Sequence, residues 1–530
     1  MFPALPKTVS FALAAISGFI CDWAFPDKNL WFLAFVSIAG LVVSIARESA
    51  AWNFFIGTTW GIAFFLPHIA WAEYAAGGTL PWIALSVSQA LFIGFAMWVF
   101  TIIRRWERIS NNMGFSALAF AFTWVSVEAL RMTIPWGGFP WGRLGFSQSD
   151  SPLARLAWLG GIPLISAVIA VLGFLIAAAI FAALRVNMWR VGLALSACVA
   201  LIIVPFTVPL DTQAQSGTLN VAGIQGNVAN PGLGAFANRQ EVLNNHVAGT
   251  HAVAGRDTTQ PLDLVVWPEN GTDIDPQVDS TASALIDEAA QAVGVPLLLG
   301  AQEYPESGGR YNVSLLWQPG VGVIDRYAKQ LPVPFGEYIP HRDFFRKLYA
   351  GVDLIYTDMI AGQEIAVVDV PVARLERTVP VAPIICFEVG YDDLIGSAVR
   401  GGAEVLFVQT NNASFGHTNE STQQLAMSRL RAIETGRSVL HISTVGVSAM
   451  YTPNGVEIAR SGHFTAEQLV GSLNLRTSLT PAVVVGKWPV YIVSAGTVLM
   501  LVAGSVAGIK QRRSRRQMGT STTSKKPGKK

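Results

Sequence analysis

Eight long apolar segments restrict the fold of this chain more than any other feature. Each is close to the roughly 20 residues that a helix needs to cross a bilayer. Only 14% of the 530 residues are charged, against about 25% in soluble domains. We therefore expect much of the chain to lie in a membrane. The candidate segments are residues 8–25, 30–46, 53–72, 80–103, 115–131, 160–184, 191–210 and 488–508.

The charges between these segments predict their orientation. With the N-terminus inside, the short inner loops are rich in arginine, whereas the outer loops near 26–29 and 73–79 carry only Lys28. The exception is the outer loop 132–159, which contains Arg143 and Arg155. Because cytoplasmic loops collect Lys and Arg, this distribution places residues 212–487 outside the cytoplasm and both termini inside.

Composition divides the chain into four parts. We expect a seven-helix membrane domain over 1–211, an outer domain over 212–487, an eighth membrane helix over 488–509 and a basic, disordered cytoplasmic tail over 510–530. The tail holds nine Lys or Arg and no acid. Nucleic-acid binding could use such a tail, but directly after an apolar helix it is better explained as a topology signal.

The outer domain has the pattern of an α/β layered fold. Short apolar runs alternate with amphipathic stretches, as expected where strands pack against helices. The predicted strands are 218–224, 262–267, 295–300, 311–318, 321–327, 378–386, 403–409, 438–443 and 448–452. The predicted helices are 237–254, 279–293, 391–400 and 418–436.

Cys386 is the only cysteine in this outer domain and ends one predicted strand. A free cysteine is often just a small buried hydrophobic residue, but a strand-to-helix turn also exposes a side chain. Backbone N–H groups in such a turn can lower a thiol pKa and bind an oxyanion. The three cysteines of the chain allow no disulfide framework. No Cys or His cluster indicates zinc, so we expect no metal and no cofactor.

Glu269 and Lys329 also follow predicted strands. Alone, each would be a solvated surface residue. Together with Cys386 they supply a base, a cation and a nucleophile at strand ends, where open α/β sheets bind ligands. A carboxylate can take the thiol proton, an ammonium can stabilise a tetrahedral oxyanion, and cysteine can form a thioester. That the three side chains meet in space is inferred.

Three short sequences resemble the signatures of the nitrilase, or carbon–nitrogen hydrolase, superfamily. They are Trp-Pro-Glu at 267–269, Tyr-Ala-Lys at 327–329 and Ile-Cys-Phe-Glu at 385–388. With Pro-Phe-Gly-Glu at 334–337 and the membrane segments, the chain resembles the apolipoprotein N-acyltransferase family more closely. Gly-Phe-Pro-Trp at 138–141 and Met-Ser-Arg-Leu-Arg-Ala-Ile-Glu at 427–434 add to this resemblance, which excludes only residues 510–530.

The resemblance implies an αββα sandwich on an eight-helix domain in a bacterial plasma (inner) membrane. It implies transfer of an acyl chain from a phospholipid donor, through a thioester on Cys386, to the N-terminal α-amino group of a diacylated lipoprotein. In this family pattern Glu269 is the general base and Lys329 stabilises the oxyanion. Glu337 and Glu388 match supporting acids. We expect a monomer.

Two sites depart from the family pattern. Phe387 replaces a tyrosine often found beside the nucleophile, so an oxyanion contact from a hydroxyl is excluded there. The loop Asn-Asn-Ala-Ser-Phe-Gly at 411–416 resembles Asn-Asp-Ala-Trp-Phe-Gly in the family, so Asn412 and Ser414 differ. The missing indole could change lipid contacts or the movement of this loop.

Four aromatic side chains are candidate substrate contacts. The loop 134–143 is rich in Trp and Phe, which suit a membrane interface. Simple anchoring at the headgroups would explain this loop as well as substrate contact does. The candidates are Trp136, Phe139, Trp141 and Phe415.

Other functions remain open from the residues alone. A membrane-bound amidase that uses water as acceptor would share Glu269, Lys329 and Cys386. A transporter or scaffold with an inactive outer domain is less consistent with the sequence. Charge is scarce within the membrane segments, and the three chemical residues are intact.

Overall fold

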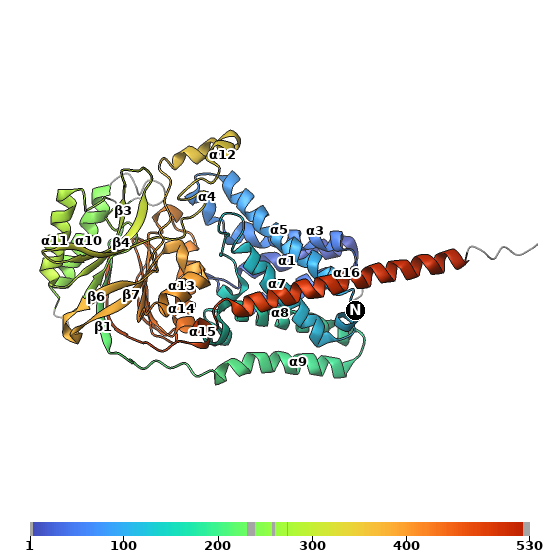
Figure 1. Ribbon diagram of the computed structural model, residues 1–530. Helices are drawn as coiled ribbons and strands as arrows, with labels where there is room; N and C mark the ends of the chain where they lie inside the picture. The colour runs from blue at the N-terminus through green and yellow to red at the C-terminus, as the bar shows by residue number, and fades with distance from the viewer. Residues whose placement is uncertain (1–3, 230–238, 257–259, 273, 523–530) are drawn as a thin grey trace, which may run out of the picture.

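The computed structural model describes residues 4–229, 239–256, 260–272 and 274–522, in which a helical bundle adjoins an α/β sandwich (Figure 1). Its long helices are apolar on nearly every face, as expected for helices surrounded by lipid or by one another. The bundle comprises α1 (Lys7–Asp22), α2 (Leu33–Ser44), α3 (Ala50–His68), α4 (Trp71–Ala75), α5 (Thr79–Ile103), α6 (Glu107–Ser110), α7 (Met113–Arg131), α8 (Ala157–Leu184), α9 (Met188–Ile203) and α16 (Trp488–Thr522).

A helix occupies each of the eight predicted membrane segments, but the lengths differ. Within the described residues, five helices are long and apolar enough to cross a membrane: Thr79–Ile103, Met113–Arg131, Pro152–Leu184, Met188–Thr207 and Trp488–Ser514. The helices α1 and α2 have 16 and 12 residues. Eight crossings and their orientation stay predictions.

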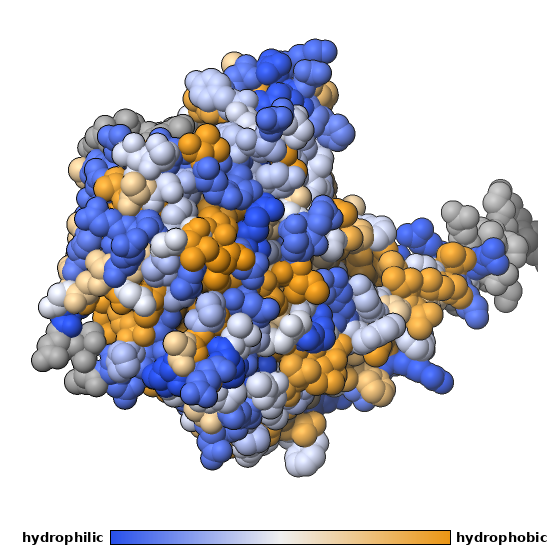
Figure 2. All heavy atoms as spheres, turned by 60° about the vertical axis from the view of Figure 1, so that its left-hand side comes forward, coloured by the Kyte–Doolittle hydropathy of each residue, from blue (hydrophilic) through white to orange (hydrophobic). Residues whose placement is uncertain are grey.

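The last helix, α16, is longer than predicted. It continues to Thr522, so residues 510–522 are helical where a disordered tail was expected. Residues 523–530, the end of that tail, lie outside the described residues. Lys, Arg and Gln are good helix formers, and no proline interrupts the run after Ser505, so the helix can extend past its apolar part. Figure 2 shows this projecting helix with hydrophobic side chains on its surface. Ile492 and Leu499 are among its exposed residues.

The second part of the chain confirms the predicted αββα sandwich. Two six-stranded sheets have the orders β12-β1-β2-β3-β4-β5 and β11-β10-β9-β8-β7-β6. Their strands are β1 (Thr218–Gln225), β2 (Leu264–Val266), β3 (Leu297–Glu303), β4 (Tyr311–Gln318), β5 (Gly322–Ala328), β6 (Val368–Val372), β7 (Arg377–Ile385), β8 (Val405–Thr410), β9 (Ser438–Ser443), β10 (Ala449–Tyr451), β11 (Glu457–Arg460) and β12 (Glu467–Asn474). The unpredicted strands β6, β11 and β12 lie at sheet edges, where partial exposure weakens the apolar pattern.

Helices cover both outer faces of the sandwich. Helices α10 (Arg239–Ala254) and α11 (Ser280–Val293) lie on the first sheet, and α13 (Asp392–Arg400) and α14 (Glu420–Thr435) lie on the second (Figure 1). All four were predicted; the expected start of the first, at 237, lies outside the described residues. The short helices α12 (Arg342–Leu348) and α15 (Pro481–Val485) were not.

Polar contacts hold the two sheets together below one sheet edge. The Gln409 side chain at the end of β8 donates to the carbonyl oxygen of Trp267 over 2.7 Å. The same side chain accepts a 2.7 Å hydrogen bond from Ser314 on β4. These contacts fix the spacing of the segments that follow β2 and β8, and Glu269 lies in the first of them.

The sandwich meets the bundle through α14, which packs on β9 with one face and on α8 with another. Asp392, at the start of α13, accepts a 2.8 Å hydrogen bond from Arg143 and forms a 2.8 Å ion pair with Arg431. Burial opposes the ionisation of Asp392, but the two guanidiniums outweigh burial and lower its pKa to about 2. Arg143, an exception to the expected charge distribution, is therefore part of the domain interface.

Replacing Asp392 by asparagine should destabilise this interface. Asp392→Asn leaves two guanidiniums short of a counter-charge, and we expect a loss of about 2 kcal/mol in the free energy of unfolding. This is less than for a fully buried pair because 28% of the Asp392 side chain is exposed. The measurement is the thermal midpoint of tryptophan fluorescence in detergent.

The neighbouring Asp393 provides the matched control for that variant. Asp393 pairs with Lys487, and both side chains are about half exposed. Exposed pairs contribute little, so Asp393→Asn should change stability by less than about 1 kcal/mol. An equal loss in the two variants would contradict the role of Asp392.

Candidate active site

A buried lysine forms the centre of the candidate site. Lys329 follows β5 and is inaccessible to solvent, with its ammonium 2.6 Å from Glu337 Oε1 and 3.4 Å from Glu269 Oε1. Burial acts to lower the Lys329 pKa, but the attraction of Glu337 and Glu269 outweighs it and raises that pKa above its ordinary value. Lys329 is therefore a fixed positive charge and not a base.

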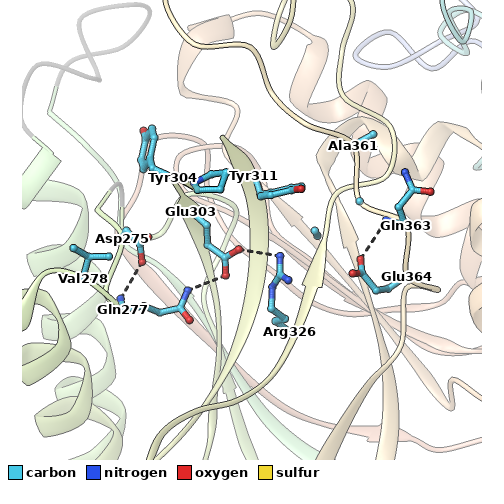
Figure 3. A pocket seen from close by; sticks show the side chains of 13 residues that line it. Asp275, Gln277, Val278, Glu303, Tyr304, Tyr311, Arg326, Ala361, Gln363 and Glu364 are labelled. Atoms are coloured by element: carbon cyan, nitrogen blue, oxygen red, sulfur yellow. Dashed lines mark hydrogen bonds and ion pairs between the residues drawn. The ribbon is translucent and has the colours of Figure 1, made fainter. Parts of the chain in front are cut away.

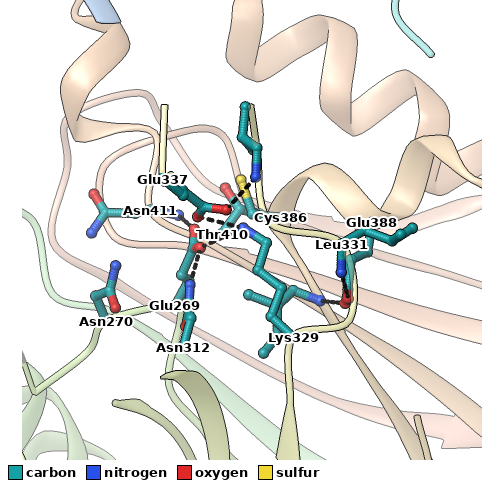
Figure 4. A network of polar contacts seen from close by, with 12 residues as sticks. Glu269, Asn270, Asn312, Lys329, Leu331, Glu337, Cys386, Glu388, Thr410 and Asn411 are labelled. Atoms are coloured by element: carbon teal, nitrogen blue, oxygen red, sulfur yellow. Dashed lines mark hydrogen bonds and ion pairs between the residues drawn. The ribbon is translucent and has the colours of Figure 1, made fainter. Parts of the chain in front are cut away.

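Glu269 is held rigidly at the same edge. One carboxylate oxygen accepts a 2.7 Å hydrogen bond from the Asn312 amide on β4. The other accepts one of 3.1 Å from the backbone N–H of Asn411, just beyond β8. Each sheet thus supplies one donor, and the carboxylate faces the space between them (Figure 4).

Cys386 lies at a sharp turn beside this cluster. It follows β7, begins a short 3-10 helix over Cys386–Gly390 and has a φ of 52°, in the left-handed region that non-glycine residues rarely adopt. Its sulfur accepts a 3.5 Å contact from the Gln424 amide. Figure 4 shows Cys386, Glu269, Lys329 and Glu337 gathered at one place.

The electrostatic state of the thiol differs from the expectation of a lowered pKa. Desolvation raises the pKa of Cys386 well above its ordinary value, and the Glu269 carboxylate raises it further, with partial opposition from Lys329. Desolvation of the sulfur raises the thiol pKa by more than the backbone N–H groups of the turn can lower it. A neutral thiol at rest needs a base before it can attack.

Glu388 connects the two segments that carry Lys329 and Cys386. Its Oε1 accepts hydrogen bonds from the Tyr327 hydroxyl and the backbone of Gln330, at 2.9 and 2.7 Å. Its Oε2 accepts from the backbone of Ile385 at 2.9 Å. Burial raises the Glu388 pKa to about 7, although these donors oppose the rise. Its position suits a supporting role.

Two glycines allow backbone segments to approach the site closely. A Cβ on Gly300 would lie 2.3 Å from the Pro268 oxygen and 2.7 Å from Glu269 Cα. A Cβ on Gly362 would lie 2.1 Å from the Ala328 oxygen, next to Lys329. Any larger residue at these positions would displace the charged side chains.

Phe387 joins the site to the helical bundle. Its ring stacks on Trp141, with centroids 5.8 Å apart and 7° between the planes, and lies 6.1 Å from Phe139. A Cβ on Gly390 would approach Pro140 Cγ to 2.5 Å, which shows how closely the two backbones meet. The residue after the thiol therefore packs against the loop between α7 and α8.

The other two aromatic candidates also lie between the domains. Phe415 packs edge-on against Trp71 of α4, with centroids 5.3 Å apart. Trp136 contacts Phe335 and Phe345 at 5.4 and 5.5 Å. That these aromatic side chains bind substrate remains a prediction.

Sequence reasoning missed Asn312 and Gln424, and it named Asn412 only as a departure from the family pattern, with no part in the site. Asn312, Asn412 and Gln424 are all buried or nearly so and all make hydrogen bonds to site residues or to one another. Asn312 lies in a correctly predicted strand, and its polar side chain in an apolar run was a usable signal. Nothing local marked the pairing of Asn412 with Gln424.

A surface hollow of about 470 Å³ lies next to the site but does not contain it (Figure 3). Glu303 in this hollow accepts a hydrogen bond from Gln277 and forms a 2.8 Å ion pair with Arg326. None of the predicted chemical residues lines it. Within the described ranges, no three His, Cys, Asp or Glu side chains are grouped to hold a metal ion.

The proximity of Glu269 and Lys329 to the thiol can be tested without an activity assay. Glu269 raises and Lys329 lowers the Cys386 pKa. Glu269→Gln should therefore shift the pH profile of Cys386 alkylation down and Lys329→Met should shift it up, each by about one unit. Peptide mass spectrometry measures the rate at this cysteine alone.

An exposed carboxylate supplies the control for these shifts. Glu288 lies on the solvent side of α11, and Glu288→Gln should leave the alkylation profile in place. Shifts of Glu269→Gln and Lys329→Met in the same direction would show that the side chains are not arranged as described.

Both parts of the chain match known families. Residues 17–175 match the apolipoprotein N-acyltransferase N-terminal domain, and residues 221–478 match the carbon–nitrogen hydrolase family. Among solved structures, the sandwich is similar to yeast Nit3 of the nitrilase superfamily. That match has a TM-score of 0.37 and 18% identity and covers 52% of this chain and 94% of that one.

Relatives match over almost the full length. An apolipoprotein N-acyltransferase of Mycolicibacterium smegmatis is 35% identical over 92% of this chain and 84% of its own. That of Azotobacter vinelandii is 31% identical over 92% and 93%. On this evidence, the chain belongs to the apolipoprotein N-acyltransferase family.

Proposed function

We propose that this membrane protein transfers an acyl chain from a phospholipid, through a thioester on Cys386, to the N-terminal amine of a diacylated lipoprotein. The observation that carries the proposal is the position of the thiol. Cys386 lies beside a buried ammonium–carboxylate cluster, and its neighbour Phe387 stacks on Trp141 of the bundle. A site at this boundary suits substrates whose acyl chains remain in a membrane.

The first half-reaction forms the thioester. Glu269 takes the thiol proton, and the sulfur attacks the carbonyl carbon of the phospholipid ester. The oxygen of the tetrahedral intermediate carries the negative charge, which the Lys329 ammonium stabilises. The ester C–O bond then breaks, Glu269 returns the proton to the leaving oxygen, and lysophospholipid departs.

The second half-reaction uses the lipoprotein amine. The neutral amine attacks the thioester carbon, Glu269 takes its proton, and Lys329 again stabilises the oxyanion. The C–S bond breaks as the amide forms, and the thiolate regains a proton. Glu337 keeps Lys329 charged in both halves, through its 2.6 Å contact.

The raised thiol pKa supports this division of roles. A neutral thiol does not react before a substrate arrives, and the Glu269 carboxylate, held by two donors, is near enough to raise the thiol pKa and is the base we assign. The aromatic contacts of Phe387 and Phe415 would help to keep water from the thioester between the two halves.

Cys386→Ala should abolish acyl-enzyme formation. The purified chain is incubated with vesicles of phospholipid that carry labelled acyl chains, and the label on the Cys386 peptide is measured. Cys198→Ala, in α9 and away from the site, is the control and should label normally. Label on protein from Cys386→Ala would refute the nucleophile assignment.

The acceptor decides between acyl transfer and hydrolysis. With phospholipid vesicles and a diacylated lipopeptide, we expect the mass of the peptide N-terminus to increase by one acyl chain. The Cys386→Ala chain should give no increase. Release of free fatty acid with an unchanged lipopeptide would instead indicate an amidase-like hydrolase that uses water.

A further inference from the structure

We propose that Gln424 is a catalytic hydrogen-bond donor to the Cys386 sulfur, and that Asn412 and Glu420 are positioning residues that fix its direction. The proposal rests on the proposed function, because it takes Cys386 as the nucleophile. It assigns a task to Asn412, one of the two positions in the 411–416 loop that differ from the family pattern.

The contact to sulfur comes from the helix that also holds the domains together. Gln424 lies on α14 and is fully buried, and its Nε2 is 3.5 Å from Cys386 Sγ. An N–H group pointed at sulfur stabilises the thiolate relative to the neutral thiol. A carbonyl oxygen pointed there would do the opposite, so the orientation of this amide matters.

Asn412 determines which end of the Gln424 amide faces the sulfur. Asn412 Nδ2 donates to Gln424 Oε1 over 2.9 Å, so the Gln424 oxygen is already engaged. If the Gln424 amide were turned around, two N–H groups would face each other. Only the observed orientation places a donor at the thiol.

Glu420 and two hydroxyls in turn fix Asn412. Asn412 Nδ2 also donates to Glu420 Oε2 over 2.7 Å, and its Oδ1 accepts from Ser443 over 2.6 Å and from Thr410. The Glu420 oxygen therefore requires a hydrogen-bond donor at residue 412. An aspartate at position 412 has no N–H and could serve neither Glu420 nor Gln424.

The chain of contacts therefore runs from a buried acid to the sulfur through two amides. Burial raises the Glu420 pKa to about 8, and its oxygen can accept from Asn412 in either protonation state. The charged and titratable groups that face Cys386 come from four segments: Glu269 after β2, Lys329 after β5, Glu337 in the loop beyond it, and Glu420 on α14.

The test is the pH profile of Cys386 alkylation by iodoacetamide in the detergent-solubilised full chain, read by peptide mass spectrometry. Gln424→Met and Asn412→Asp each remove the donor, so both profiles should move to higher pH. At a fixed pH below the thiol pKa, the rate should fall about tenfold. Gln424→Met changes only the side chain that contacts the sulfur. This variant alone decides the result if Asn412→Asp folds poorly.

Thr422→Val is the matched control on the same helix. The Thr422 hydroxyl donates to Asp27 and to the backbone oxygen of Asn419 and does not contact the sulfur. This substitution adds no charge and should leave the alkylation profile unchanged. An unchanged profile in Gln424→Met, or an equal shift in Thr422→Val, would overturn the proposal.

A double substitution tests whether Asn412 acts by orienting the Gln424 amide or only by stabilising the fold. In Asn412→Asp/Glu420→Gln, the new amide at 420 can donate to the new carboxylate, which restores that hydrogen bond and should restore thermal stability. The carboxylate still cannot donate to Gln424, so the alkylation profile should stay shifted. Recovery of both properties would show that the pair acts only in folding and would refute the positioning role.

Two outcomes distinguish an error in the role of Gln424 from an error in the proposed function. If Cys386→Ala still forms the acyl product, the proposed function is wrong. If Cys386→Ala is inactive but Gln424→Met keeps the original alkylation profile and rate of acyl-enzyme formation, only the role of Gln424 is wrong.

Discussion

The buried ammonium of Lys329 is the constraint on which the site depends. A cation without access to water is tolerated only beside opposite charges, and Glu337 and Glu269 supply them at 2.6 and 3.4 Å. Both sheets must therefore keep their loops in register, and the donors from Asn312 and Asn411 hold one of these carboxylates. The same requirement explains why Gly300 and Gly362 have no side chains where they touch this segment.

Helix α14 links this charged cluster to the helical bundle. Gln423 accepts hydrogen bonds from the indoles of Trp141 and Trp71, while the next residue, Gln424, reaches the Cys386 sulfur. The ion pairs of Arg431 with Asp392 and Glu434 lie further along the same helix. A change in the packing of the two domains would therefore act directly on the surroundings of the thiol.

Sequence patterns predicted the helices and strands better than they predicted the surroundings of the side chains at the site. The strands before Glu269 and Cys386 are strongly apolar because both faces of each sheet are covered, and they were predicted close to their observed bounds. The edge strand β5 before Lys329 was also predicted, although it is only partly buried. The edge strands β6, β11 and β12 were missed because partial exposure dilutes this signal. The sequence did not give the direction of the thiol pKa shift, because local turn geometry says nothing about how deeply carboxylates and apolar groups enclose the sulfur.

The sequence alone determined the class of fold and the family, and it predicted Glu269, Lys329 and Cys386 as base, cation and nucleophile, because each of these inferences depends on residue type and on order along the chain. Tertiary structure decided which groups surround the thiol. Gln424 follows Cys386 by 38 residues and Asn412 precedes Gln424 by 12, so no local pattern connects them. Only the packing of α14 against the second sheet brings these amides to the sulfur, and only that packing gives Asn412 its role.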